Sequence, residues 1–224
     1  MKTFEHTFFH GTFRDYQQNV LANIDKHLED KKVHIVAAPG SGKTILGLEI
    51  IRRLGSPALI LSPSVTIRQQ WGQRFREKFL PQHEEVGDYV SFRLQQPGLL
   101  TSVTYQSIHS AYNRIPDKAD PDDEEYDAGC ADYSGFDLIQ TVRDQKITTI
   151  CLDEAHHLKS EWQRSLEKFI AAVQGEVYII ALTATPPYDS APSEWNRYTA
   201  LCGEIDEEIG VPELVIQNLS LIHI

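Results

Sequence analysis

The stretch Ala37-Ala38-Pro39-Gly40-Ser41-Gly42-Lys43-Thr44 decides the fold of this chain. It follows a short apolar run at 33–37 that is typical of a buried strand, and it opens a segment with helical periodicity at 44–54. A glycine-rich turn between a strand and a helix directs successive backbone N–H groups toward one point at the helix N-terminus, where negative charge is favoured. The stretch therefore predicts a loop that binds a polyphosphate.

The residue types within this loop predict a nucleotide as the ligand. Gly40 and Gly42 permit the tight turn. The Lys43 side chain would reach the β- and γ-phosphates, and the Thr44 hydroxyl would bind Mg²⁺. The general pattern begins with a glycine where this chain has Ala37, and an ordinary glycine-rich turn is the alternative interpretation. The predicted nucleotide-binding residues of the loop are Pro39, Gly40, Ser41, Gly42, Lys43 and Thr44.

A second motif supplies the acidic residues that hydrolysis of a bound nucleotide needs. The apolar run at 147–152 ends in Asp153-Glu154-Ala155-His156. Asp153 would hold Mg²⁺ through water, and Glu154 would polarise the attacking water, so Glu154, Asp153 and Lys43 are the predicted catalytic residues. The adjacent His156-His157 pair lacks the HExxH spacing and a supporting cluster of ligands, so we predict no zinc site.

The rest of the chain alternates short apolar runs with helical periodicity. The expected strands are 33–37, 58–61, 99–104, 147–152 and 177–182. The expected helices cover 16–28, 44–54, 67–79 and the segment from Ser160, where Ser160 and Gln163 form a capping box. Such alternation predicts an α/β fold with a mostly parallel sheet covered on both faces.

Composition excludes several other classes of protein. The 224 residues are 41% hydrophobic and 24% charged, which excludes a disordered or fibrous chain and fits one large α/β domain or two small ones. No apolar run is long enough to span a membrane. Three cysteines without a CxxC pair argue against a disulfide framework and favour a cytoplasmic location.

The net charge of −11 argues against a broad basic surface for nucleic acid. Most of the acidity lies in one segment, because residues 116–137 contain nine Asp or Glu and one Lys. We interpret this segment as a solvated surface insertion, with repulsion of nucleic acid from the wrong face as the alternative.

The chain resembles the superfamily 2 DEAD/DEAH-box helicases and translocases, and most closely the motor subunits of restriction enzymes. Besides the two motifs above, it has further matches in the order in which this family has them. The resemblance spans about residues 10–190. It rests on APGSGKT, on DEAH, and on four weaker matches: Phe13-Arg14-Asp15-Tyr16-Gln17, Ser62-Pro63-Ser64 with Gln70-Trp71, Val103-Thr104-Tyr105-Gln106-Ser107-Ile108, and Leu182-Thr183-Ala184-Thr185-Pro186-Pro187. The fold that this resemblance implies is a three-layer RecA-like P-loop NTPase domain.

The resemblance also implies roles for residues outside the two main motifs. It implies adenine recognition by Arg14 and Gln17, nucleic-acid contacts by Pro63, Ser64, Thr104 and Tyr105, and coupling of nucleotide to nucleic acid by His156, Thr183 and Thr185. Simpler interpretations stay open. Gln17 could be an exposed helix residue, Ser64 an N-cap, and Thr104 with Tyr105 the end of a strand.

The predicted function is therefore that of an ATP-binding motor domain of a DNA helicase or translocase, which uses ATP and Mg²⁺. An RNA helicase domain, a nucleotide-binding fragment without independent activity and a small-molecule kinase are the alternatives. We expect the first motor domain at 1–203 and a truncated tail or the start of a linker at 204–224. The resemblance implies that a second RecA-like domain, absent from this sequence, closes over ATP and supplies an arginine finger.

Overall fold

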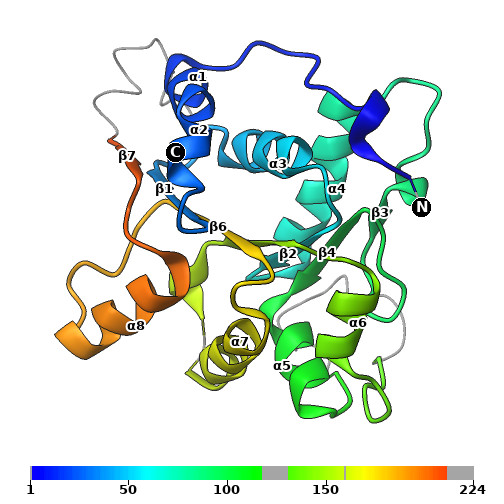
Figure 1. The fold of residues 1–224 in the computed structure, drawn as a ribbon, viewed down its shortest axis with the longest axis vertical. Helices are drawn as coiled ribbons and strands as arrows, with labels where there is room; N and C mark the ends of the chain where they lie inside the picture. The colour runs from blue at the N-terminus through cyan, green and yellow to red at the C-terminus, as the bar shows by residue number, and fades with distance from the viewer. Residues whose placement is uncertain (1, 118–130, 159, 211–224) are drawn as a thin grey trace.

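Seven parallel strands form the centre of the molecule (Figure 1). The computed structural model describes residues 2–117, 131–158 and 160–210. The strand order is β3-β4-β2-β5-β6-β1-β7, and every pairing between neighbours is parallel. The strands are β1 (Lys32–Ala37), β2 (Ala58–Ser62), β3 (Val90–Ser91), β4 (Leu100–Thr104), β5 (Thr149–Asp153), β6 (Tyr178–Thr183) and β7 (Glu207–Ile209).

Helices cover both faces of this sheet, which makes three layers. The first face is covered by α1 (Asp15–Ala22), α2 (Ile24–His27), α3 (Lys43–Leu54) and α4 (Val65–Phe79). The second face is covered by α5 (Tyr105–Asn113), α6 (Leu138–Asp144), α7 (Ser160–Val173) and α8 (Pro192–Cys202). Short 3₁₀ turns complete the described elements: η1 (Phe4–His6), η2 (Val86–Asp88) and η3 (Ala155–His157). The prediction of an α/β fold with a parallel sheet is confirmed.

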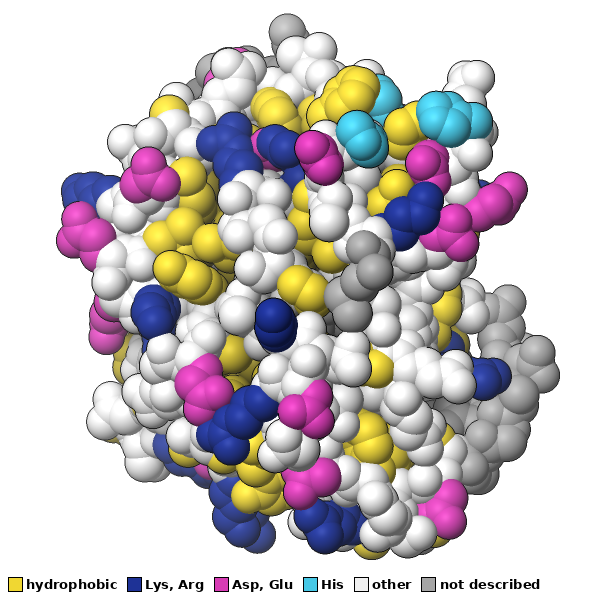
Figure 2. Space-filling model, turned by 45° about the vertical axis from the view of Figure 1, so that its right-hand side comes forward, with side chains coloured by type: hydrophobic (Ala, Val, Ile, Leu, Met, Phe, Trp, Pro, Cys, Tyr) yellow, Lys and Arg dark blue, Asp and Glu magenta, His cyan; other side chains and the backbone are white. Residues whose placement is uncertain are grey.

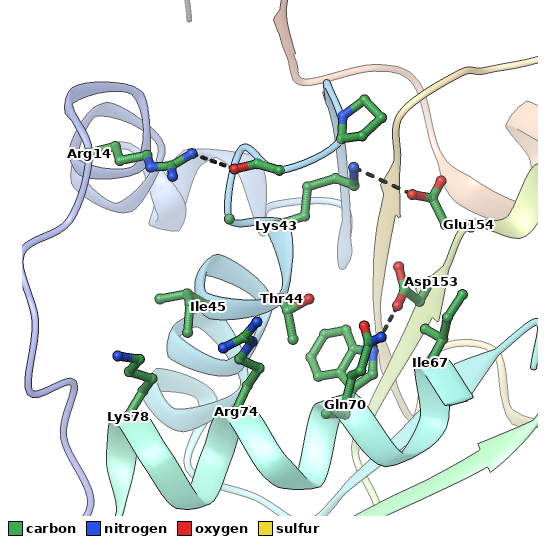
Figure 3. A pocket seen from close by; sticks show the side chains of 14 residues that line it. Arg14, Lys43, Thr44, Ile45, Ile67, Gln70, Arg74, Lys78, Asp153 and Glu154 are labelled. Atoms are coloured by element: carbon green, nitrogen blue, oxygen red, sulfur yellow. Dashed lines mark hydrogen bonds and ion pairs between the residues drawn. The ribbon is translucent and has the colours of Figure 1, made fainter. Parts of the chain in front are cut away.

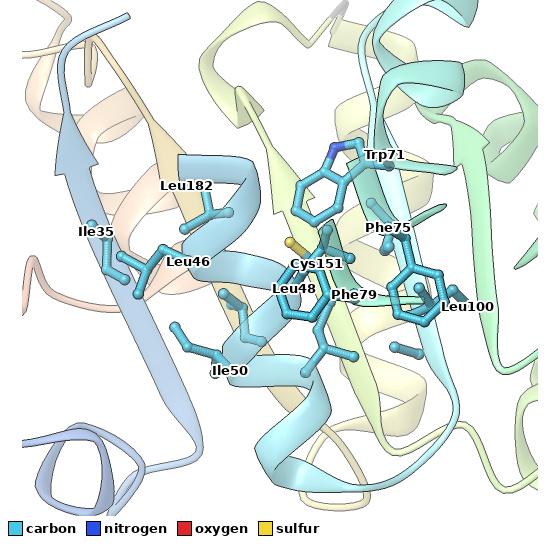
Figure 4. Close-up of a cluster of buried hydrophobic side chains, with 14 of the residues drawn as sticks. Ile35, Leu46, Leu48, Ile50, Trp71, Phe75, Phe79, Leu100, Cys151 and Leu182 are labelled. Carbon is cyan, nitrogen blue, oxygen red and sulfur yellow. The ribbon is translucent and has the colours of Figure 1, made fainter. Parts of the chain in front are cut away.

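Alternating side chains of the strands fill two separate cores. On β2, Ala58 and Ile60 face the first core, whereas Leu59 and Leu61 face the second. In the first core, α3 lies between β1 and the aromatic row of α4, as Figure 4 shows. Both cores are apolar because a parallel sheet is buried on both faces.

Several elements differ from the sequence predictions. The predicted helix at 16–28 is interrupted at Asn23, which separates α1 from α2. The strand β7 lies beyond residue 203 and pairs with Ile35–Ala37 of β1, so the sheet continues past the predicted domain boundary. The division of the chain into domains stays a prediction.

The acidic segment 116–137 is described only at its two ends, because 118–130 lie outside the described residues. The interpretation as a solvated segment is wrong for its first acidic residue and stays a prediction for 118–130. Asp117 is 4% exposed, and its carboxylate accepts hydrogen bonds from Ser107 Oγ at 2.8 Å and Ser110 Oγ at 3.0 Å. Asp137, at the other end, is exposed and caps the N-terminus of α6.

The surface drawn in Figure 2 carries basic and acidic side chains interspersed with one another. Among the described residues, no helix is both long and apolar enough to cross a membrane.

Candidate active site

The loop between β1 and α3 has the backbone shape that its glycines predict. Gly40 and Gly42 have φ of +74° and +96°. The backbone of Gly42 therefore favours glycine, and a Cβ there would also lie 2.8 Å from Gln17 Nε2, so the Gln17 carboxamide would have to move. Ala37, which stands where the general pattern has glycine, is the last residue of β1 and pairs regularly with Ile209. Its extended backbone needs no glycine.

The N-terminal part of α1 supports this loop through three carbonyl groups. Arg14 Nη1 donates to Gly40 O at 2.8 Å, Tyr16 Oη donates to Ser41 O at 3.1 Å, and Gln17 Nε2 donates to Gly42 O at 3.0 Å. Gln17 is 3% exposed, so the interpretation as an exposed helix residue is wrong. Arg14 lines a pocket beside the loop, which is described below, whereas the Gln17 carboxamide is hydrogen-bonded to the loop itself. Adenine recognition by either residue stays a prediction.

The predicted catalytic lysine and glutamate lie together at the carboxyl edge of the sheet. Lys43 Nζ is 3.4 Å from Glu154 Oε1 and donates to Ala37 O at 2.8 Å. The second carboxylate oxygen of Glu154 accepts hydrogen bonds from Ala184 N at 3.0 Å and Thr183 Oγ1 at 3.2 Å. Glu154 itself has a left-handed backbone, with φ of +51°, a conformation rare for a side chain of this kind. Its carboxylate is thus fixed by contacts from the end of β6 and from the first residue of α3.

Asp153, the preceding residue, is buried at the end of β5. Burial raises the pKa of its carboxyl to about 6, and the charge of Glu154 adds to the rise, while the Trp71 N–H and Lys43 oppose it. The Trp71 Nε1–H donates to Asp153 Oδ2 at 2.7 Å. In the sequence Trp71 is part of a motif match on an expected helix, and nothing in its spacing indicated this contact with a carboxylate.

A cavity of about 430 Å³ joins these groups (Figure 3). One wall is the phosphate loop with Thr44, and the carboxylates of Asp153 and Glu154 lie at one end. The other wall is α4, which contributes a polar row of Gln70, Arg74 and Lys78. Gln70 belongs to a motif match in the sequence but had no predicted place in this site, and no motif indicated Arg74 or Lys78. The spacing of four residues along a helix is the signal that could have indicated a shared face.

The three residues predicted to couple nucleotide to nucleic acid are brought together. The His156 ring lies between two threonines, with Nδ1 at 2.7 Å from Thr183 Oγ1 and Nε2 at 2.9 Å from Thr185 Oγ1. Thr183 also touches Glu154, so the ring and the carboxylate share one hydroxyl. The coupling role itself stays a prediction.

The residues predicted to contact nucleic acid lie at the ends of β2 and β4, which are in register through Ser62 and Thr104. The Ser64 and Thr104 hydroxyls cap α4 and α5, accepting from Ile67 N at 3.3 Å and Ser107 N at 3.2 Å. These caps confirm the simpler interpretation of Ser64. Pro63 precedes the first cap and is partly exposed.

Tyr105 requires a correction. Its side chain is 1% exposed, and its hydroxyl donates to Asp153 O at 2.9 Å. A buried ring has no surface at which to meet a nucleic acid, so its side chain supports the end of β5 instead.

The three-layer parallel fold, the glycine-rich loop after β1 and the acidic pair after β5 define the class of RecA-like P-loop NTPase domains. Residues 10–188 match the family model described as type III restriction enzyme, res subunit, and the chain belongs to this family. The predicted membership among superfamily 2 helicase ATPase domains is thereby confirmed.

Relatives extend this finding. The chain is 26% identical over 208 residues to the DNA 3′-5′ translocase XPB2 of Sulfurisphaera tokodaii, covering 90% of this chain and 36% of that protein. It is 25% identical over 182 residues to a protein of Haloarcula marismortui that is named, provisionally, as the DNA 3′-5′ helicase Rad25. This match covers 81% of this chain and 24% of that protein. The chain thus spans about a third or less of the length of these relatives.

A solved structure supports the fold. The Hef helicase domain of Pyrococcus furiosus superimposes with a TM-score of 0.58 at 17% identity, covering 91% of this chain and 39% of that chain.

Proposed function

We propose that this chain is the ATP-binding motor domain of a DNA helicase or translocase, in which ATP hydrolysis drives movement on DNA. One observation carries the proposal. Lys43 from the phosphate loop, Asp153 at the end of β5 and Glu154 just after it line a single cavity, at the edge of the sheet where ligands of open α/β folds bind.

ATP is the substrate that this cavity fits. Backbone N–H groups at the start of α3 and the Lys43 ammonium would bind the phosphates. Arg14 at one end of the cavity, with Arg74 and Lys78 on the α4 wall, adds positive charge for the rest of a nucleotide. Thr44 and Asp153 also line the cavity, and their hydroxyl and carboxylate oxygens are of the kind that Mg²⁺ prefers as ligands. When bound there, Mg²⁺ neutralises charge on the β- and γ-phosphates.

Glu154 is suited to act as the general base. The backbone N–H of Ala184 and the Thr183 hydroxyl hold one carboxylate oxygen, and the other oxygen faces Lys43 in the cavity. A phosphate that recruits the Lys43 ammonium would free that oxygen to orient water and accept its proton.

His156, Thr183 and Thr185 are proposed to relay the state of this site. Their hydroxyls and ring form a continuous set of hydrogen bonds that includes the Glu154 carboxylate. Any displacement of the loop after β6 would therefore also move the general base. The hydroxyls of Ser64 and Thr104, at the adjacent strand ends, are the proposed contacts with the nucleic-acid backbone.

The names of the relatives favour DNA over RNA, because both relatives named above are described as acting on DNA. We further propose that a second motor domain contributes the arginine finger, which is typically worth ~10³–10⁵ in rate. Without it, the 224 residues would bind ATP and hydrolyse it slowly.

The test is ATP turnover by the natural polypeptide that contains this chain, measured with double-stranded DNA, single-stranded DNA and RNA. Stimulation by either DNA supports the proposal. Stimulation by RNA alone would replace it with the RNA helicase alternative. Nucleotide binding without stimulated turnover would identify a nucleotide-binding fragment instead.

A further inference from the structure

The indole of Trp71 joins the core to the acidic end of the cavity. Trp71 is 1% exposed, and its ring packs against α3, where a Cβ on Gly47 would lie 2.8 Å from Trp71 Cη2. The nitrogen of the ring lies on the edge away from α3 (Figure 4), and its N–H donates to Asp153 Oδ2 at 2.7 Å, the bond that is dashed at Asp153 in Figure 3.

This contact fixes the orientation of the Asp153 carboxylate. The Tyr105 hydroxyl holds the backbone carbonyl of Asp153, and the Trp71 N–H holds one oxygen of its side chain. The carboxylate is therefore fixed from two helices, α4 and α5, that cover opposite faces of the sheet. Oδ2 is occupied by the indole, which leaves Oδ1 to serve a ligand in the cavity.

A buried indole N–H needs a hydrogen-bond partner, and a backbone carbonyl would satisfy it as well as a carboxylate does. Here the partner is the carboxylate that the sequence assigns to Mg²⁺. Groups that orient a metal-binding carboxylate commonly change metal affinity by about 10–100-fold when they are removed.

We propose that Trp71 is a positioning residue for Mg²⁺, acting through the Asp153 carboxylate rather than by contact with metal or nucleotide. The proposal rests on the proposed function, because it requires that the cavity bind a nucleotide together with Mg²⁺. The indole N–H keeps the carboxylate in one rotamer, so the site does not have to order it when the ion binds.

The experiment measures ADP affinity of the protein by calorimetry as a function of Mg²⁺ concentration, with an EDTA-treated sample as the metal-free reference. Two substitutions remove the donor: Trp71→Phe, and replacement of Trp71 by benzothienylalanine, which keeps the ring size but carries sulfur in place of the N–H. Both are expected to raise the half-saturating Mg²⁺ concentration about tenfold. Both are expected to leave metal-free ADP affinity within about twofold of the unmodified protein.

Phe75→Leu is the matched control, because Phe75 is a fully buried aromatic residue on the same helix with no polar edge. It is expected to lower stability without changing the Mg²⁺ dependence. An unchanged Mg²⁺ dependence in the benzothienylalanine protein would overturn the proposal, and so would an equal shift in Phe75→Leu. If the unmodified protein binds no nucleotide at all, the proposed function itself fails.

Discussion

Lys43 and Glu154 are ion-pair partners in this structure, with 3.4 Å between Nζ and Oε1. Both side chains are largely shielded from solvent, with exposed fractions of 10% and 19%. The cation that would bind the phosphates and the carboxylate that would activate water therefore neutralise each other. Binding of a phosphate group beside Lys43 would break this pairing, which links occupancy of the cavity to release of the proposed base.

Glu154→Gln is expected to separate binding from chemistry. The carboxamide can still accept hydrogen bonds from Ala184 N and Thr183 Oγ1, but it cannot take a proton from water. We expect ATP turnover to fall by ~10²-fold or more while nucleotide affinity stays within a few-fold. Turnover assays and calorimetry on the natural polypeptide check this, with Glu161→Gln on the exposed side of α7 as the control. Normal turnover in Glu154→Gln would place the base elsewhere.

Thr183→Val is expected to uncouple ATP hydrolysis from DNA. It keeps the shape of a residue that is 1% exposed but removes the hydroxyl shared by His156 and Glu154. Loss of such buried hydrogen bonds costs about 1–3 kcal/mol, so we expect DNA stimulation to fall roughly tenfold.

Thr149→Val is the matched control for this substitution. Thr149 is a buried threonine at the start of β5, and among the described residues its hydroxyl has no hydrogen-bond partner. Equal loss of stimulation in both variants would show a packing effect and contradict the coupling role.

Gly42→Ala is expected to deform the phosphate loop. The new Cβ would lie 2.8 Å from Gln17 Nε2 at a residue with φ of +96°. A strained backbone of this kind costs about 1–3 kcal/mol, which thermal unfolding would detect, and the displaced loop should bind nucleotide at least ~tenfold more weakly. Gly87→Ala is the control, since its Cβ would meet nothing within 4 Å. A Gly42→Ala protein with unchanged stability and affinity would show that the loop needs no glycine there.

Asp153→Asn is expected to stabilise the protein at neutral pH. The pKa of the buried carboxyl rises from 3.8 to about 6, so the folded state holds this proton more tightly than the unfolded state does. The protonated carboxyl therefore favours the folded state, and the free energy of unfolding falls as the pH rises from about 4 to 6. A shift of about two units corresponds to up to roughly 3 kcal/mol, which Asn would restore above pH ~6.

Urea unfolding at pH 4.5 and 7.5, without nucleotide or metal, measures this difference. We expect the advantage of Asp153→Asn to be largest at pH 7.5 and small at pH 4.5. The control Asp132→Asn should act in the opposite direction, because the Ser134 backbone N–H lowers the pKa of Asp132. An advantage of Asp153→Asn that is equal at both pH values would contradict the assignment of the effect to ionisation.

Local sequence signals were sufficient for the elements that build the cavity. The strands β1, β2, β4, β5 and β6 are apolar runs, and their predicted ends lie within two residues of the observed ones. The phosphate loop and the acidic pair are contiguous motifs, so their positions at the ends of β1 and β5 followed from the strands alone. The order of the seven strands and the two edge strands, β3 and β7, did not follow from these local signals.

The contacts that could not be predicted join residues far apart in sequence. Trp71 and Asp153 are separated by 82 positions, and nothing in the helical pattern of α4 distinguishes an indole that packs from one that also donates. The edge strand β7 reads Glu207-Glu208-Ile209, and a short charged strand is typical of a sheet edge but carries no apolar signal. Tyr105 was assigned by resemblance to the surface, whereas packing of α5 against the sheet buries its ring.

The most direct test of the proposed nucleotide site is calorimetric titration of this chain with ATP in the presence of Mg²⁺. We compare the unmodified protein, Lys43→Ala, and Lys168→Ala on the exposed side of α7. We expect binding to one site in the unmodified protein and in Lys168→Ala. We expect a loss of at least ~10²-fold in affinity for Lys43→Ala, because that change removes a charge-assisted contact with the phosphates. Equal affinity in all three proteins, with the fold intact, would contradict the proposed site.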